Sequence, residues 1–492
     1  MDPPPDVVLN ASRDAGLRLV TGCTKTLGAT IGFDTNAAAT LCSDRMRRQA
    51  PFFRRFVLPD LPAQAAREMI RQSGVPRANF ITRTNAPDVT ADATEWFDNQ
   101  VLHAFATVTK LGSIPPDSLE AQCCQMPLRH GGRGLISASL VAPAAFFASA
   151  AETARAFVDH RGHPVLHDDA LWDTPIGQSI LAAHDSLATI LNRFADRNER
   201  TALAVAAFFP ANGRDFFTFY GSDTWYKLQS RIMSFVHRWR REQSASLCDR
   251  KDSARLLSCS APGASLAATS VPDPQTPSTS MTNEVVATYT ALVLGRLRHT
   301  PTARRCRCSH ASLSNGEEHF LVCRSMSGAW WQRHDLIVRE LMEWCRKAGC
   351  QVDYEPQPWW ETDNKRPDLT IYSPEGVFQL DASVTHPAAS SFVDIAQRRL
   401  GAAKAREAVK RRHYEDRCLP GFFIPFVLET YGAFGPAATE FMKRIARWAD
   451  NLSGVDAAVF YARMRTAISS SLARGNALIV FRGRARPPVH VR

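Results

Sequence analysis

Three cysteines and one histidine lie close together in the second half of this 492-residue chain, in the pattern Cys-x-Cys-x10-His-x3-Cys. They are Cys306, Cys308, His319 and Cys323. Thiolate and imidazole groups are the usual ligands of tetrahedral Zn²⁺, and four of them complete a closed structural site. Because residues four apart share one face of a helical turn, His319 and Cys323 are expected to point the same way. The pattern therefore predicts that this part of the chain folds around a structural zinc ion.

Two alternatives for this group stay open. His310 also lies between the cysteines and competes for the nitrogen position, although His319 has the better spacing to Cys323. Reduced cysteines also pack in protein cores as small apolar side chains without any metal. Most of the 12 cysteines of the chain are scattered singly, so this group is the one with ligand spacing.

Composition and charge favour a folded protein with a polyanionic partner. Hydrophobic residues make up 45% of the chain and the formal net charge is +11. Basic side chains that neutralise phosphates release counterions, which favours nucleic acid as the partner. The opening residues Met1–Pro5 lack the basic and apolar regions of a secretory leader, and the longest apolar stretch, near 140–151, is too short to cross a bilayer. We expect an intracellular protein with reduced cysteines, no membrane partner and no small-molecule ligand.

The fold class expected from these patterns is α+β with several domains. Residues 1–248 are expected to be mostly helical, because apolar residues recur at helical spacing in 61–73, 92–109, 140–157, 179–194 and 225–243. Residues 249–283 are rich in Ser, Pro, Thr and Ala, which predicts a disordered, flexible linker. Residues 284–330 are expected to hold a helix and the zinc site. The element order α-β-β-α-β-α predicts a mixed α/β domain at 331–450, followed by a C-terminal helix and basic tail at 451–492.

Two aspartates lie in a β-hairpin predicted after the Cys/His group. Its strands, 368–372 and 377–385, are joined by a Ser-Pro-Glu-Gly turn. Asp368 opens the first strand, and Asp381 follows it after twelve residues in the middle of the second. A carboxylate on a largely buried strand is costly unless it is paired or bound to a metal. Two of them across a hairpin can hold Mg²⁺, although an ordinary hairpin with solvated aspartates is the alternative.

A basic helix is predicted over 393–414. Arg406, Lys410 and Tyr414 recur every four residues there, so they share one face of the helix. A lysine beside a metal-bound phosphate can stabilise the charge that develops during cleavage. The alternative is a solvated basic helix that touches a nucleic-acid backbone or nothing at all.

These motifs resemble the restriction-like endonuclease domain of site-specific non-LTR retrotransposons, a variant of the PD-(D/E)xK nucleases. The resemblance rests on Arg366-Pro367-Asp368, on the spaced Asp381 and on a lysine displaced to the following helix. That family also carries a CCHC zinc knuckle just upstream, as this chain does. The resemblance implies a restriction-endonuclease-like α/β domain that nicks target DNA and so primes reverse transcription. It also implies structural Zn²⁺ and catalytic Mg²⁺, the latter held by the two aspartates.

The catalytic lysine departs from the ordinary superfamily pattern. Ser383 occupies the position where that pattern places a lysine, two residues after the second acid. In the retrotransposon variant the lysine is displaced together with a tyrosine, which points to Lys410 and Tyr414, with Lys404 in reserve. Expected DNA contacts come from four arginines: Arg366, Arg406, Arg411 and Arg412.

An acid on the preceding helix and the N-terminal half complete the resemblance. Glu340 could match the superfamily's first-helix acid, and Glu343 competes with it. Segments 26–32, 79–84 and 128–135 look like the thumb and linker region that follows the palm of these elements' reverse transcriptases. The chain lacks the paired aspartates of a polymerase palm, so no polymerase activity is expected. The implied partners are DNA and element RNA, and the implied location is the nucleus.

Two other functions stay open at this stage. A truncated retroelement copy could be a catalytically dead remnant that still binds nucleic acid, with salt-dependent affinity and no cleavage. A helical host protein with a zinc site is the third candidate, and it would show no affinity for phosphate.

Overall fold

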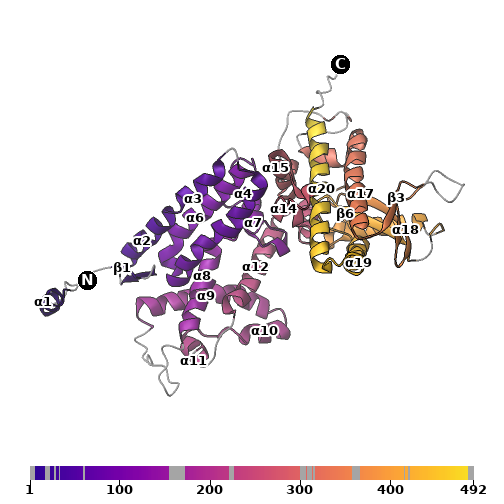
Figure 1. Ribbon diagram of the computed structural model, residues 1–492. Coiled ribbons are helices and arrows are strands. Elements are labelled where there is room, and N and C mark those ends of the chain that lie inside the picture. The colour runs from indigo at the N-terminus through magenta and orange to yellow at the C-terminus, as the bar shows by residue number, and fades with distance from the viewer. Residues whose placement is uncertain are drawn as a thin grey trace. The chain divides into compact units, whose positions relative to one another are not determined.

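The computed structural model describes residues 6–16, 23–26, 29–32, 34–58, 61–154, 172–220, 227–299, 306, 308, 313, 316–356, 366–414, 416–418 and 421–485. The protein is mixed α+β and mostly helical, with one small hairpin and one four-stranded sheet (Figure 1). It divides into two compact units, each built from several stretches of chain. Unit 1 comprises 1–55, 74–101 and 136–239, and unit 2 comprises 56–73, 102–135 and 240–492. Within the described residues, no helix has the length and apolar character needed to cross a membrane.

In its described residues, unit 1 is helical apart from the hairpin of β1 (Cys23–Thr26) and β2 (Ala29–Gly32). Its helices are α1 (Asp6–Asp14), α2 (Thr35–Arg47), α3 (Ala50–Arg54), α5 (Asn79–Thr84), the first part of α6 (Pro87–Val108), α8 (Ala138–Ala154), α9 (Pro175–Ala195), α10 (Glu199–Ala206), α11 (Phe216–Tyr220) and most of α12 (Leu228–Ser246). An aromatic cluster forms its core: the Phe147 ring lies 5.2 Å from Phe209 and 5.1 Å from Phe216, centroid to centroid. The expected helices at 92–109, 140–157, 179–194 and 225–243 are thus present as α6, α8, α9 and α12.

Unit 2 contains the sheet, whose strand order is β3-β4-β5-β6. The strands are β3 (Gln351–Tyr354), β4 (Leu369–Ser373), β5 (Gly376–Thr385) and β6 (Phe423–Glu429). The first three pair antiparallel, whereas β6 runs parallel to β5. The predicted hairpin and third strand are therefore present. The edge strand β3 was not predicted, because its four residues are too few for alternation to be recognised.

Helices cover both faces of this sheet. Helices α17 (Ser327–Lys347), α19 (Pro436–Ser453) and α20 (Ala457–Ala485) share one core with the strands, built around Leu341, Leu380, Phe426, Phe441 and Ile468. Helix α18 (Gly401–Tyr414) packs on β5 and β6. Its partners on β5 alternate with Leu380, so α18 lies on the opposite face. Helices α17 and α20 pack along each other (Figure 1).

The remaining elements of unit 2 come from two parts of the chain. Helices α4 (Ala63–Met69) and α7 (Leu119–Gln125) come from the first half of the sequence. Helices α13 (Arg250–Cys259), α14 (Leu266–Thr269), α15 (Asn283–Val293) and α16 (Arg296–His299) precede the Cys/His group. The expected helix at 61–73 is present as α4, and the helix expected within 284–330 as α15 and α16.

The expectation of a disordered linker at 249–283 is wrong. Helix α13 is capped by Asp249, and Ala254, Leu256 and Cys259 on it are buried. Downstream, the side chain of Gln64 on α4 donates to the Ser270 hydroxyl and the Thr279 carbonyl, both at 2.9 Å, and accepts from the backbone at 281. Small residues and hydrogen bonds to α4 therefore order a segment that has few large apolar side chains of its own.

Two expected boundaries also differ from the structure. The first half of the chain is not a separate domain ending at 248, because 56–73 and 102–135 belong to unit 2. The C-terminal helix is not separate from the α/β domain at 450, because α20 contributes Met464, Ile468 and Leu472 to the core of the sheet. The expected basic tail lies beyond 485, outside the described residues, as does Met1–Pro5.

The glycine-rich turn at 128–135 is a close-packed connection. Gly131 has a φ of 87°, and a Cβ there would lie 3.0 Å from the Leu256 carbonyl oxygen of α13. A Cβ on Gly132 would lie 1.9 Å from the carbonyl oxygen of Met126. Both positions therefore require glycine for packing.

A buried arginine on α13 provides a test of whether the segment 249–283 is ordered. Arg255 is 1% exposed, bonds to Asp252 at 3.1 Å and donates to the Val293 carbonyl at 2.7 Å. We expect Arg255→Met to lower the free energy of unfolding by about 3–5 kcal/mol, because it breaks a buried ion pair. The control is Arg250→Ala on the same helix, whose ion pair with Asp394 is exposed and worth about 1 kcal/mol at most. Denaturant unfolding measures both, and equal effects would contradict an ordered α13.

Candidate metal centre and acidic pocket

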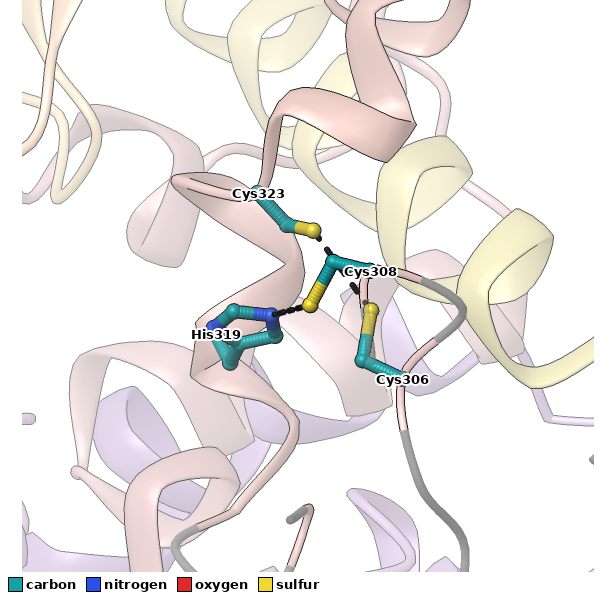
Figure 2. A group of neighbouring side chains, drawn as sticks. All are labelled: Cys306, Cys308, His319 and Cys323. Carbon is teal, nitrogen blue, oxygen red and sulfur yellow. Dashed lines mark hydrogen bonds between the residues drawn. The ribbon is translucent and has the colours of Figure 1, made fainter. Parts of the chain in front are cut away.

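The Cys/His group predicted from spacing comes together in space. The ligand atoms of Cys306, Cys308, His319 and Cys323 all lie within 4.8 Å of one another (Figure 2). The sulfurs of Cys306 and Cys323 are 3.5 Å apart, and the Cys308 sulfur lies 3.4 Å from Nε2 of His319. Ligand atoms of a tetrahedral site with Zn–S bonds of about 2.3 Å are separated by about 3.8 Å. The cluster can therefore hold a metal such as zinc, whereas the competing His310 lies outside the described residues.

The surroundings suit a metal-binding set of side chains. Burial lowers the pKa of His319, which favours the neutral imidazole that binds metals. Burial raises the pKa of Cys323 to about 11. Burial also acts to raise the pKa of Cys306, but hydrogen bonds from the Cys308 backbone and from Ser325 outweigh it and lower this pKa. Three thiols this close would repel one another as thiolates, and a divalent cation removes that penalty.

The cluster is part of the unit 2 core. Cys306 and Cys323 pack with Leu297, Phe320 and Val480. His319 lies on the 3₁₀ helix Glu317–Leu321, which falls between Cys308 and Cys323 in the sequence. The buried Glu318 beside it accepts a hydrogen bond from the Tyr431 hydroxyl and lies 3.6 Å from Nε2 of His386, just after β5. The metal-binding segment is thereby joined to the ends of β5 and β6.

The two aspartates predicted in the hairpin line one pocket of about 470 Å³. Asp381 lies on β5 and is 6% exposed. Asp368 immediately precedes β4, and its Oδ2 accepts a hydrogen bond from the backbone of Ala382 at 2.6 Å. This bond holds the Asp368 carboxylate against β5, beside the strand that carries Asp381.

Helix α18 meets β5 in register. Four residues of helix rise about 6 Å and two residues of strand about 6.6 Å, so the two spacings match. Lys410 donates to both carboxylate oxygens of Asp381 at 2.7 Å, and Arg406 donates to the Ser383 hydroxyl at 3.0 Å. One turn further on, the Tyr414 hydroxyl donates to the carbonyl of Arg366 at 3.1 Å. The predicted face of the helix therefore lies along the strand.

Two buried glutamates fix the position of α18. Oε1 of Glu429, at the end of β6, accepts a hydrogen bond from the Ala403 backbone at 3.0 Å in the first turn of α18. Glu407 on α18 in turn accepts from the Ala437 backbone at 3.0 Å in the first turn of α19. A carboxylate at a helix N-terminus satisfies free backbone N–H groups and interacts well with the helix dipole. These contacts leave Lys410 with little freedom to shift along the sheet.

The structure separates the two candidate lysines. Lys410 lines the pocket and pairs with Asp381. Lys404 is exposed on α18 and does not line the pocket. Among the arginines, Arg366 and Arg406 line it, whereas Arg411 and Arg412 are exposed outside it.

The acid expected on the preceding helix is not in the pocket. Glu340 accepts hydrogen bonds from the Trp344 indole at 2.9 Å and from the Ser278 hydroxyl at 2.8 Å. Glu343 pairs with Arg346 at the surface. Instead, α17 directs His334 at the site, where its Nε2 lies 3.0 Å from Oδ2 of Asp368. A single histidine on an amphipathic helix has no motif around it, which is why sequence reasoning missed it.

The charged groups that line the pocket shift one another's pKa values. Burial and the neighbouring Asp368 charge raise the pKa of Asp381, and Lys410 opposes them. Burial disfavours protonated His334, but its hydrogen bond to Asp368 and the negative charges of Asp368 and Asp381 together outweigh burial and raise the pKa of His334. The buried carboxylate of Asp381 and the half-buried carboxylate of Asp368 are a donor set that suits Mg²⁺, which prefers oxygen ligands. Asp368 and Asp381 are thus the residues that would hold such an ion.

No protein-family model matches this sequence, and no curated protein matches it at a significant level. The assignment of a function therefore depends on the geometry of the two sites.

The Cys/His cluster leads to a direct prediction about metal content. We expect the purified chain to carry about one equivalent of zinc, and Cys323→Ser to lose it, because three ligands bind far less tightly than four. Cys418→Ser is the matched control, since Cys418 is a free, half-buried cysteine that does not belong to the cluster. Elemental analysis of the two variants checks this. Equal zinc contents, or a folded wild-type chain without metal, would contradict a zinc site.

Proposed function

We propose that unit 2 is a metal-dependent DNA endonuclease of a retrotransposon-derived protein. The observation that carries the proposal is the pocket in which Asp368, Asp381 and Lys410 converge. Two carboxylates and one lysine are the groups that phosphodiester cleavage needs, and each comes from a different element of the fold. Chance surface pairs of charged residues are normally exposed, whereas Asp381 is buried and Lys410 donates to both of its carboxylate oxygens.

Each residue has a specific role in this proposal. Asp368 and Asp381 would hold Mg²⁺, and the bound ion would supply Lewis-acid activation of water and of the phosphate. Lys410 donates hydrogen bonds to a phosphate oxygen and stabilises the charge that develops there. Arg366 and Arg406 line the same pocket and contact backbone phosphates of the bound strand. Tyr414 is a positioning residue, because its hydroxyl donates to the backbone carbonyl of Arg366 and so holds that residue at the pocket.

The zinc cluster has a structural role in this proposal. Four protein ligands leave no open coordination position for substrate, which is the arrangement of structural zinc sites. The net charge of +11 supports DNA as the partner, and element RNA as a second one. In an intact element the nick would prime reverse transcription, and the chain would act in the nucleus.

A matched pair of lysines on α18 tests the endonuclease proposal. We expect the full chain to nick supercoiled DNA in the presence of Mg²⁺, and Asp381→Asn to abolish nicking. Lys410→Ala should lower the rate about 10²- to 10³-fold, as loss of a preorganised donor does at other active sites. Lys404→Ala removes the same charge from the same helix outside the pocket, so it should keep most of the activity.

Conversion of supercoiled plasmid to open circles measures these rates. Equal losses in the two lysine variants would assign the effect to general DNA affinity and contradict a catalytic Lys410. Salt-dependent DNA binding with no Mg²⁺-dependent nicking would favour the alternative, a nucleic-acid-binding remnant without catalysis.

A further inference from the structure

The α17 wall of the pocket carries two consecutive tryptophans, Trp330 and Trp331. Trp331 is 65% exposed, although tryptophan side chains are on average highly buried. Its ring packs edge-on against His334, with centroids 5.8 Å apart and an interplanar angle of 68°. This contact holds the indole at the pocket and leaves most of its surface uncovered. A single exposed aromatic residue is ordinary on a protein surface, so its meaning comes from its neighbours.

Cations line the same pocket from other elements. Arg366 precedes β4, and Arg406 and Lys410 come from α18. Positive side chains beside an open aromatic face are the combination that binds single-stranded nucleic acid, since the cations contact the backbone and the ring stacks on a base. A nucleotide whose phosphate lies against these cations can present its base to the tryptophans.

We propose that Trp331 stacks on an unpaired base next to the phosphate in the pocket, so that the nuclease acts on a locally unpaired strand. This inference rests on the proposed function and adds a substrate class to it. In a continuous duplex each base face is covered by its neighbours, so a stacking side chain requires a base that has left the stack. Stacking is tolerant of sequence because every base has a π-face. Trp331 therefore selects the structure of the DNA and not its sequence.

Fluorescence of 2-aminopurine tests the stacking directly and without cleavage. The probe is placed in a short unpaired bubble, or in the matched fully paired duplex, and the full chain is added with no divalent ion. We expect quenching in the bubble only. Trp331→Ala should abolish it and weaken bubble binding about 5- to 150-fold, the range measured for loss of one base–aromatic stack. Trp331→Phe should restore both.

The control variant is Tyr372→Ala, which removes an exposed aromatic of the same sheet that does not line the pocket. It should leave quenching and affinity unchanged. Quenching that survives Trp331→Ala, or equal losses of affinity for bubble and duplex, would overturn the proposal. Salt-dependent binding that ignores Trp331 altogether would assign the contact to phosphates only and overturn it as well.

A cleavage assay separates this inference from the endonuclease proposal. With Mg²⁺, the wild type should nick the bubble faster than the duplex, and Trp331→Ala should remove that preference. Equal nicking of both substrates by the wild type overturns the inference and leaves the endonuclease proposal intact. Trp331-dependent quenching without any nicking upholds the stacking site and overturns the endonuclease proposal.

Discussion

The parallel pairing of β5 with β6 is the constraint on which the acidic pocket depends. Antiparallel strands can be joined by a tight turn, but parallel neighbours need a crossover that passes over one face of the sheet. In this chain the crossover contains α18. A basic helix is thereby laid across the strand that carries Asp381, and the near-equal repeats of helix and strand bring Lys410 and Arg406 onto alternate residues of β5. The charge pairs follow from the topology and need no special loop.

Periodicity predicted much of this arrangement. The four-residue repeat predicted that Arg406 and Lys410 share one face of α18, and alternation along β5 puts Asp381 and Ser383 on one face of the sheet. What periodicity cannot supply is the register between two elements that are distant in sequence. Register decides that Lys410 and not Arg406 meets Asp381, and it is set here by the buried Glu429, whose carboxylate fixes the start of α18.

The two expectations that the structure contradicts, for Glu340 and for the segment 249–283, failed for a common physical reason. Glu340 is a reasonable candidate for the pocket from the sequence, but Ser278 and Ser471, both distant in sequence, donate hydrogen bonds to its carboxylate oxygens. The segment 249–283 was expected to be disordered because it lacks large apolar residues. Its small residues instead allow close approach to α4, where Gln64 and Arg67 satisfy its backbone carbonyls. Tertiary partners decided both cases, and composition within a short window does not contain them.

The metal cluster and the acidic pocket are connected through α17. Cys323, the last ligand of the cluster, is followed by a short 3₁₀ turn at 324–326, after which α17 begins at Ser327. The first two turns of α17 carry Trp331 and His334 into the pocket. A metal bound by Cys323 would therefore fix the start of the helix whose side chains form one wall of the pocket. Glu318, which lies beside His319, also contacts residues just after β5 and β6. An ion bound in the cluster would therefore be connected to the ends of these two strands as well as to α17. On this geometry, a metal held by the cluster would support the pocket through the position of α17.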